Sequence, residues 1–336
     1  MSSPNPVRVA VDAMGGDFAP AEIVQGAVAA AAQGGVQILL VGDPEAMERE
    51  LAQHDTQGLP ILPVPSEGVV LEGESPVQVL REKPRASIVV ATGLVKAGKA
   101  DALVSMGSTG ATMAASAFLL GLMDGIERPA IGGHIVGLAP NTVILDLGSN
   151  VDCRPGQLLS FAALGTTFAR VYLGIAEPRV ALLSVGTEEG KGNRQTKETY
   201  ELLKASHLNF VGNVEGHDIP RGTADVVVCD GFVGNVVMKL MEGLGAELSA
   251  HLTRRLEGRL DREELDSLTR EVYTLLNKAE QSGGGPLFGV RGISIVGHGQ
   301  ARAQAVTRAI GTARQISEMD LMGKMEAELA LLGKPA

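Results

Sequence analysis

Glycine-rich loops that also carry Asn, Asp, Thr or Lys follow five short apolar runs of this chain. The runs are Val7–Val11, Ala102–Met106, Val143–Leu147, Val180–Val185 and Val226–Cys229. Apolar, β-branched runs of this length are typical of strands buried on both faces of a sheet. Ligands of open α/β sheets bind just beyond the carboxyl ends of such strands. Because glycine lets backbone N–H groups approach an anion, the pattern predicts a site for phosphate or another oxyanion.

Lys191 is the candidate whose surroundings point most directly to an anion. It lies between two glycines in the loop that follows Val180–Val185, and the same loop holds Gly186 and Asn193. An ammonium in such a loop can contact phosphate while neighbouring amides bind other oxygens. The alternative is an ordinary solvated lysine. The company of glycine and asparagine favours a functional role.

Polar side chains at the ends of the predicted strands form two further groups. Each of four asparagines comes just after a strand and near a glycine: Asn150, Asn193, Asn213 and Asn235. Asparagine is also a common turn former, so a structural role is the alternative, but together these amides can donate to a developing oxyanion. Three aspartates occupy strand ends, as ligand contacts or as helix caps: Asp12, Asp146 and Asp230.

Loop histidines and one arginine complete the candidates. His217 and His298 can each supply a proton or simply bond a local carbonyl. Arg291 follows a glycine-rich loop and is a second possible anion contact. Cys229 at a strand end has the chemistry of an acyl-accepting nucleophile, although a buried inert thiol is the stronger interpretation.

Composition excludes several classes of function. The chain has 336 residues, a net charge of −10, no Trp and 3% aromatic residues, which argues against a nucleic-acid partner. Its two cysteines lack metal-ligand spacing, so we expect no metal site, and we expect no cofactor. The small number of cysteines favours a reduced, cytoplasmic protein, and no signal peptide is evident.

Alternating strand and helix signals predict a three-layer α/β/α fold with a mainly parallel sheet. We expect a single compact unit, 1–336, with two lobes. The uncharged stretch Ala102–Met123 is long enough to span a membrane, but its Ser, Thr and Gly content favours a buried strand, a turn and a buried helix. Residues 234–281 carry helical signals only and predict a hairpin that breaks near Gly258, with a new helix capped by Asp261. Its expected role is contact with a second subunit, a partner or a membrane.

Seven of the glycine-rich segments, taken in order, resemble the phosphate acyltransferase family of bacterial phospholipid synthesis. They are Asp12–Asp17, Ser105–Ala111, Leu145–Cys153, Leu183–Asn193, Phe210–Gly216, Asp225–Asn235 and Gly284–Gly289. Each motif is weak alone, but seven in order over nearly the whole chain are specific. One departure is Ser108, where the family usually has Asn.

The resemblance implies an enzyme that transfers a fatty acyl group from acyl carrier protein (ACP) to inorganic phosphate, giving acyl phosphate. It implies a homodimer with a fold like that of isocitrate and isopropylmalate dehydrogenases, peripheral at the inner membrane face. A glycerol-3-phosphate acyltransferase would then use the product. Substrate positions implied by the motifs are Gly15, Gly16, Gly107, Ser108, Thr109, Gly148, Gly186 and Glu215.

Phosphate is already a nucleophile near neutral pH, so the required chemistry is positioning and stabilisation of the carbonyl oxygen. We expect Lys191 and loop amides to bind phosphate, Asn150, Asn193 or Asn213 to meet the oxyanion, and His217 to protonate the leaving thiolate. Because ACP is acidic, its expected docking sites are basic: Arg254, Arg255 and Arg259, or Arg81, Lys83 and Arg85.

Three alternatives remain on the sequence alone. One is a short-chain phosphate acyltransferase that uses coenzyme A thioesters, and another is a dehydrogenase on the same scaffold. The third is a non-catalytic scaffold whose hairpin recruits lipid-synthesis proteins to a membrane.

Overall fold

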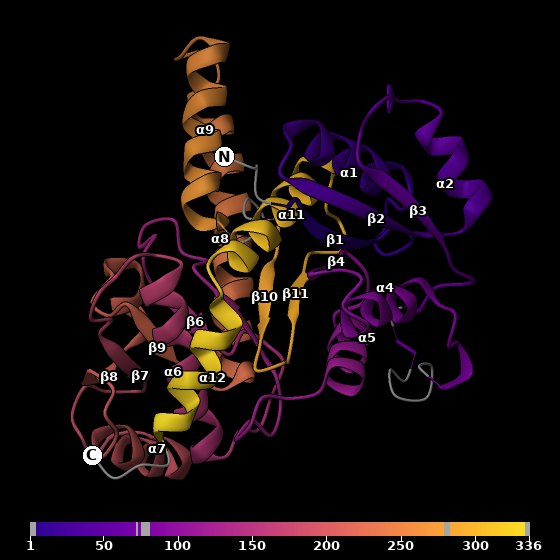
Figure 1. Cartoon of the computed structure of the whole chain (residues 1–336). Helices are drawn as coiled ribbons and strands as arrows, with labels where there is room; N and C mark the ends of the chain where they lie inside the picture. Colours follow the sequence, from indigo (N-terminus) through magenta and orange to yellow (C-terminus); the bar gives the residue numbers. More distant parts are fainter. Residues whose placement is uncertain (1–4, 72, 75–80, 279–282, 333–336) are drawn as a thin grey trace. The chain divides into compact units, whose positions relative to one another are not determined.

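The computed structural model describes residues 5–71, 73–74, 81–278 and 283–332, and its chain divides into two compact units. Unit 1 comprises Met1–Met123 and Ser282–Lys324, and unit 2 comprises Asp124–Gln281 and Met325–Ala336. Each unit holds its own run of strands and its own covering helices (Figure 1).

Unit 1 is built on a six-stranded run in the order β3-β2-β1-β4-β11-β10, parallel except for β10. The strands are β1 (Val7–Asp12), β2 (Val36–Gly42), β3 (Ile61–Pro65), β4 (Ala102–Ser105), β10 (Gly285–Phe288) and β11 (Ile293–Val296). The helices are α1 (Ala21–Gln33), α2 (Pro44–Leu51), α4 (Ser87–Lys96), α5 (Thr109–Ala115), the π-helix η1 (Ser116–Leu120) and α11 (Ala303–Glu318).

Helices cover both faces of the unit 1 sheet. Ala10, Leu39 and Leu103 face α4 and α5, where they form one buried cluster with residues of those helices. Successive strand residues point to opposite faces, so Val9 and Val11 face the other layer, in which α1 packs against α11. Strands buried on both faces explain why their sequences are continuously apolar.

Unit 2 repeats the design with five strands in the order β5-β6-β9-β7-β8, of which only β5 is antiparallel to its neighbour. The strands are β5 (Ala130–Gly133), β6 (Val143–Leu145), β7 (Val180–Leu183), β8 (Phe210–Val214) and β9 (Val226–Val228). The helices are α6 (Pro155–Val171), α7 (Arg194–Lys204), the short 3-10 helix η2 (Gly216–Arg221), α8 (Gly231–Leu256) and α9 (Arg262–Leu276). The last helix, α12 (Leu321–Leu332), divides between the two units at Lys324.

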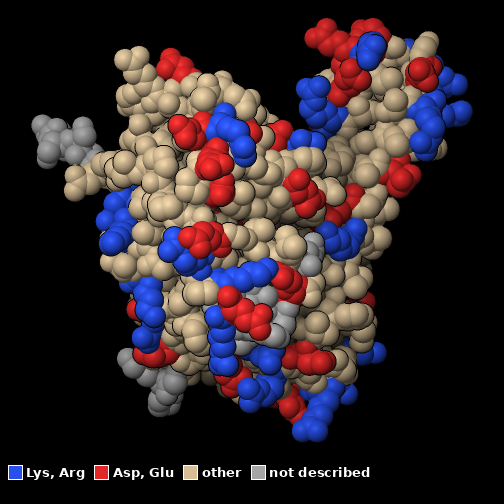
Figure 2. All heavy atoms as spheres, turned by 90° about the vertical axis from the view of Figure 1, so that its right-hand side faces the viewer, with Lys and Arg blue, Asp and Glu red and all other residues tan. Residues whose placement is uncertain are grey.

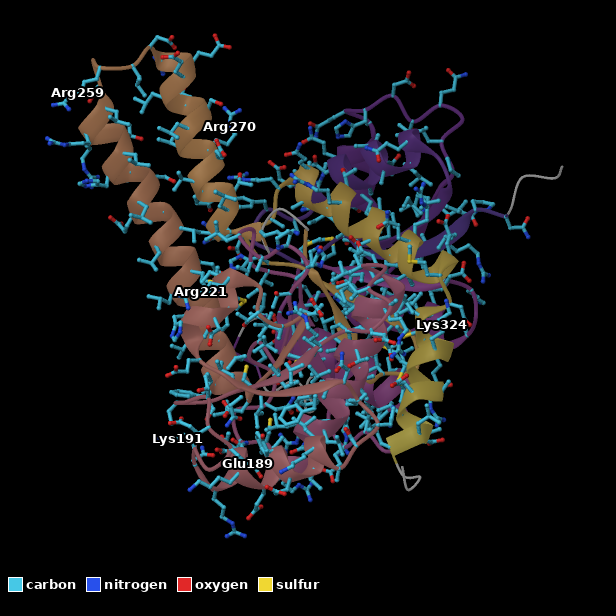
Figure 3. The ribbon with its side chains drawn as sticks, turned by 90° about the vertical axis from the view of Figure 1, so that its left-hand side faces the viewer. Glu189, Lys191, Arg221, Arg259, Arg270 and Lys324 are labelled. Atoms are coloured by element: carbon cyan, nitrogen blue, oxygen red, sulfur yellow. The ribbon has the colours of Figure 1, made fainter. Side chains whose placement is uncertain are left out.

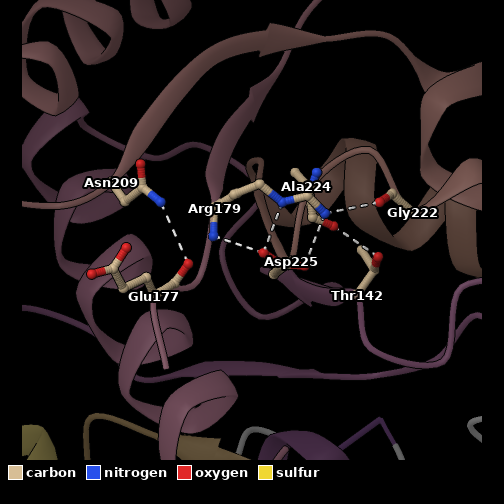
Figure 4. Close-up of polar contacts among 7 residues, drawn as sticks. All are labelled: Thr142, Glu177, Arg179, Asn209, Gly222, Ala224 and Asp225. Carbon is tan, nitrogen blue, oxygen red and sulfur yellow. Dashed lines mark hydrogen bonds and ion pairs between the residues drawn. The ribbon is translucent and has the colours of Figure 1, made fainter. Parts of the chain in front are cut away.

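Polar contacts fasten the amino ends of the strands in unit 2 (Figure 4). Arg179, just before β7, forms a two-bond ion pair with Asp225, just before β9, with N–O distances of 3.0 Å. Thr142, just before β6, donates to the carbonyl of Ala224 at 2.8 Å. Because these groups satisfy one another's hydrogen bonds, the amino ends of the strands have a structural role. The candidate residues lie at the carboxyl ends of the strands.

α8 and α9 form the expected hairpin of unit 2. The Ser249 hydroxyl donates to the Thr269 carbonyl at 3.0 Å, and Gly245 leaves room for the Asn277 side chain. Asp261 caps α9 by accepting from the Glu264 amide at 2.9 Å, as predicted. Gly258 lies in the connection with a φ of 74°, a value that glycine adopts readily.

The α/β class and the mainly parallel order of the strands are confirmed. The stretch Ala102–Met123 forms β4, a turn, α5 and η1, as expected. Among the described residues, no helix combines the length and the apolar composition needed to cross a membrane. The segment that forms β10 was expected to be a loop, and α12 was not predicted. The sequence also favours a short helix over 76–81, and almost all of that range lies outside the described residues.

Candidate functional site

Three loops meet at the carboxyl edge of the unit 1 sheet, after β1, β4 and β11. The Ser105 hydroxyl donates to Asp12 Oδ2 at 2.8 Å and accepts from the Gly107 amide at 3.1 Å. The Asp17 amide donates to the Gly299 carbonyl at 2.8 Å. A Cβ on Gly15 would lie 2.8 Å from the Gly107 backbone nitrogen, so the loops after β1 and β4 pass too closely for any larger residue at this position.

Asp12 is the buried centre of this loop cluster. Burial raises its pKa, while hydrogen bonds from the Ser105 hydroxyl and the Met14 amide act in the opposite direction. Its oxygens therefore hold the first loop in place. Ser108 caps α5 by accepting from the Ala111 amide at 3.4 Å, and Thr109 begins that helix.

Two candidates of unit 1 lie apart from one another. His298 follows β11, is exposed, and accepts from the Gln300 amide at 3.3 Å, so it belongs to the loop cluster. Arg291 precedes β11 and therefore lies at the opposite edge of the sheet. The sequence favours a strand over Ile293–Val296, which already lies between Arg291 and His298, but β10 was interpreted as a loop and the separation was not predicted.

Four loops gather at the carboxyl edge of the unit 2 sheet, and Asp146 organises the first of them. Its Oδ1 accepts from the amides of Gly148 and Ser149 at 3.1 and 3.0 Å. Its Oδ2 accepts from the amide and from the side chain of Asn150, at 2.7 and 2.9 Å. Burial raises the pKa of Asp146, and these donors oppose that rise. The carboxyl group is thus a fixed anchor for the loop.

Asn150 has its side-chain donors engaged within this loop. The amide nitrogen donates to the Pro129 carbonyl and to Asp146 Oδ2, both at 2.9 Å, and the residue is buried. With both protons committed, the side chain has none left for an oxyanion in this structure. The geometry favours a positioning role over the donor role that the sequence suggested.

The N-terminus of α8 lies directly against the same loop. Asp230 caps it by accepting from the Val233 amide at 2.9 Å, and the Gly231 amide donates to the Asn150 carbonyl at 2.7 Å. A Cβ on Gly148 would lie 3.3 Å from Asn235 Oδ1, so Asn235 in the first turn is a close neighbour. Such a helix start favours negative charge.

The glycine loop, Gly186–Asn193, follows β7 and carries Lys191 (Figure 3). The Lys191 side chain is 53% exposed, and its Nζ lies 4.0 Å from Glu188 Oε1. Asn193 caps α7, and its Oδ1 accepts from the Thr196 amide at 2.9 Å and from the Thr196 hydroxyl. Lys191 is therefore free to move toward a ligand at this edge, since its present contact is weak and solvated.

The end of β8 and the loop after it bring three further candidates to this edge. Asn213 is 6% exposed and donates from Nδ2 to the Glu188 carbonyl at 3.0 Å. Glu215 starts η2, and its backbone amide donates to Asp218 Oδ2 at 3.0 Å. His217 is exposed, with Nε2 3.4 Å from Asp218 Oδ1. Asn213 therefore ties its strand to the glycine loop, and His217 is accessible for proton transfer.

Both cysteines are buried, and their thiols are poor nucleophiles. Burial, followed by the charge of Asp146, raises the pKa of Cys153 to about 12. Burial also raises the pKa of Cys229 well above its ordinary value, with Asp230 and Asp146 adding to the effect. A thiolate is the reactive form, so an acyl-enzyme route through Cys229 is disfavoured. Within the described ranges, no group of three or more His, Cys, Asp or Glu could hold a metal ion.

Ser184 is a candidate that sequence reasoning missed. It ends the apolar run before the glycine loop, and its hydroxyl is buried with no hydrogen-bond partner among the described residues. Its position just before the glycine loop could have marked it as a candidate. Which residues surround it depends on the pairing of β7 with β8, and the sequence does not show that pairing.

A family model described as "fatty acid synthesis protein" matches residues 7–324. A phosphate acyltransferase of Desulforamulus reducens is 44% identical over 96% of this chain and 97% of its own length. That of Moorella thermoacetica is 48% identical over 91% of each chain. In fold, a phosphotransacetylase from Streptococcus pyogenes aligns with a TM-score of 0.60, at 20% identity, over 93% of this chain and 94% of its own. This chain therefore belongs to the fatty acid synthesis protein family, whose relatives named here are acyltransferases, and it is an enzyme of that transferase class.

Proposed function

We propose that this protein transfers a fatty acyl group from acyl-ACP to inorganic phosphate and releases acyl phosphate for phospholipid synthesis. The observation that carries the proposal is the gathering of the glycine loop with Lys191, the Asp230-capped start of α8 and the loop after β8 at one sheet edge. Backbone amides, a helix start and a mobile ammonium suit a small oxyanion. The names of the relatives agree with phosphate as the acceptor.

The reaction needs no activated protein nucleophile. An oxygen of hydrogen phosphate attacks the thioester carbonyl carbon, and the C–S bond then breaks. Lys191 holds the phosphate in line, and amides at the edge of unit 2 stabilise the carbonyl oxygen as it gains charge. Fixing two reactants in this way removes the entropic cost of their encounter, which is a large part of the barrier.

The proton balance closes without a cofactor. Hydrogen phosphate begins with one proton, the acyl phosphate product carries none, and the thiol that leaves has gained one. His217 is exposed beside Asp218 and can relay this proton. A thiol with a pKa near ~8.5 also leaves tolerably as thiolate, so we expect His217 to contribute less than Lys191.

The acidic acyl carrier protein requires a local basic surface, because the whole chain carries a net charge of −10. Within the part of the chain that the structure describes, Lys83 and Arg85 already pair with Glu74 and Glu67. Arg254, Arg255 and Arg259, by contrast, form no ion pair there. Figure 2 shows Lys and Arg side chains interspersed with Asp and Glu on the hairpin, and Figure 3 labels Arg259 and Arg270 there. We therefore place ACP docking on the hairpin.

A homodimer, peripheral contact with the inner membrane face and delivery of product to a glycerol-3-phosphate acyltransferase complete the proposal. Support for a second subunit comes from α8, where five large apolar side chains at four-residue spacing are exposed. They are Phe232, Val236, Leu240, Leu244 and Leu248. An apolar ridge of this length is uncommon on an isolated protein surface.

Hydroxylamine trapping tests the proposed reaction directly. The protein is mixed with long-chain acyl-ACP, with and without phosphate, and hydroxamate is measured. Hydroxamate that depends on phosphate is the expected result, because acyl phosphate reacts faster than the thioester. A parallel assay with acetyl-coenzyme A separates the long-chain from the short-chain enzyme. No phosphate-dependent product from either donor would refute the proposal.

A further inference from the structure

Two buried polar atoms beneath the glycine loop of unit 2 have no hydrogen-bond partner among the described residues. They are Ser184 Oγ, in the residue that follows β7, and Asn213 Oδ1, in β8. A buried polar atom without a partner costs free energy, so its presence calls for an explanation. One explanation is a ligand that supplies the missing bonds.

The pairing of β7 with β8 directs both side chains to the same face of the sheet. Leu182 is opposite Asn213, and side chains two residues apart share a face, so Ser184 shares the face of Asn213. The register shifts between Val180 and Leu182, where β8 contains one extra residue and Gly212 has a φ of 100°. Without that bulge, Asn213 would point to the opposite face. Bulges of this kind are common beside active sites, where they redirect a side chain.

The orientation of the Asn213 amide is fixed by its other bond. Nδ2 donates to the Glu188 carbonyl in the glycine loop, so the atom left over is the acceptor Oδ1. Whatever completes the site must therefore bring a hydrogen-bond donor to Asn213. The Ser184 hydroxyl, on the same face of the sheet, can donate or accept.

The glycine loop covers this pair closely. A Cβ on Gly192 would lie 3.1 Å from Ser184 Oγ and 2.7 Å from the Thr196 side chain, so the backbone passes directly overhead. Glu189 of the loop is held to α7 by an ion pair with Lys204 at 2.7 Å. Lys191 belongs to the same loop, so the segment that covers the two polar atoms also carries a cation.

We propose that Asn213 Oδ1 binds the hydroxyl group of the phosphate substrate, that Ser184 Oγ binds a neighbouring oxygen, and that the site so selects a protonated oxyanion. This inference rests on the proposed function. Phosphate and arsenate carry a proton near neutral pH, whereas sulfate carries none. Asn213 accepts from the P–O–H group, Ser184 donates to a neighbouring oxygen, and Lys191 closes from above. Sulfate would face Oδ1 with no proton to offer and leave that acceptor unpaired.

Sites that hydrogen-bond a particular group of the substrate discriminate strongly against analogues that lack it. We therefore expect arsenate to compete with phosphate, and sulfate to compete at least ~100-fold more weakly. Removing the acceptor should raise the KM for phosphate by about tenfold and leave inhibition by sulfate unchanged or stronger, so that selectivity falls.

The experiment compares wild type with Asn213→Ala and Ser184→Ala. Asn209→Ala is the matched control, because this amide also donates to a carbonyl but lies at the other end of the same strand. Rates of hydroxamate formation give the KM for phosphate and the inhibition constants of arsenate and sulfate. Ser184→Ala removes one buried hydroxyl and tests the site even if Asn213→Ala fails to fold.

Binding of the three oxyanions is also measured by calorimetry without any acyl donor. Preference for phosphate in that assay without acyl transfer would refute the proposed function and leave this inference standing. Sulfate that binds wild type as tightly as phosphate would overturn the inference. So would phosphate-to-sulfate selectivity that stays unchanged in both folded variants.

Discussion

At the scale of single residues, Lys191 is the side chain on which phosphate binding depends most. Lys191→Ala should reduce turnover by ~100-fold, because the variant loses the charge that orients the nucleophile. The side chain is half exposed and makes only a 4.0 Å contact with Glu188, so unfolding should be unaffected. Steady-state rates and thermal unfolding check both parts. Lys197→Ala, on the exposed side of α7, is the control, and an equal loss in that variant would contradict the assignment.

Asp146 should act through the loop that it organises. In Asp146→Asn, one oxygen that accepts hydrogen bonds becomes a donor facing other donors, so we expect a loss of ~3 kcal/mol in unfolding free energy and a lower kcat. Asp225→Asn is the matched control, since it replaces a carboxylate that pairs with Arg179 at the amino ends of the strands in the same unit. Denaturant unfolding and kcat are measured for both. The positioning role fails if Asp225→Asn lowers kcat as much as Asp146→Asn does.

The sequence identified which loops carry polar residues, but not what each side chain does. Asn150 and Asn213 looked alike, each an amide after a strand. In the folded chain, Asn150 Nδ2 donates to Asp146 and to the Pro129 carbonyl, whereas Asn213 Oδ1 has no donor bonded to it among the described residues. That difference depends on residues far away in sequence and on a bulge at Gly212, which composition does not reveal.

At the scale of elements, apolar runs predicted β1, β4, β6, β7 and β9, because burial on both faces leaves a clear pattern, and helical signals predicted the hairpin of α8 and α9. β10 was missed because Gly283, Gly284 and Pro286 look like a loop. It is a strand because its backbone pairs with β11 in antiparallel register, Gly285 with Val296 and Pro286 with Ile295. Tertiary pairing thus overrode local propensity there.

The apolar ridge of α8 leads to a prediction about assembly. Leu240 and Leu244 are 60% and 45% exposed, so a partner that covers them would gain hydrophobic free energy. Leu240→Glu combined with Leu244→Glu should convert the proposed dimer into a monomer, as measured by sedimentation. His251→Glu, elsewhere on α8, is the control. A wild-type monomer, or a dimer unaffected by the double substitution, would count against a subunit contact at this ridge.

At the scale of the whole molecule, the two units share one plan: a mainly parallel sheet, helices on both faces and a buried aspartate at the carboxyl end of a strand, Asp12 or Asp146. In each unit, an Arg–Asp pair ties the amino ends of neighbouring strands, Arg8 with Asp101 and Arg179 with Asp225. These ion pairs fix the amino ends of the strands, and the loops at the carboxyl ends carry the candidate functional residues.

The stability of this molecule should fall in mild acid, and His134 supplies part of the reason. Its ring stacks on Phe168 in unit 2, with centroids 6.2 Å apart. Burial, followed by the charge of Lys278, lowers the pKa of His134 to about 4. The unfolded chain, with an ordinary pKa near ~6.5, therefore binds more protons between these values, so stability is retained above pH ~6.5 and declines as the pH falls toward 4.

From pH 7 to pH 5 this residue should cost about 2 kcal/mol of unfolding free energy. His134→Phe keeps an aromatic ring in the stack but cannot titrate. Between pH 7 and pH 5, this variant should therefore lose about 2 kcal/mol less unfolding free energy than wild type. Urea unfolding at both pH values measures the difference, with His251→Phe on the exposed face of α8 as the control. Equal acid sensitivity in wild type and His134→Phe would show that the buried imidazole does not set this dependence.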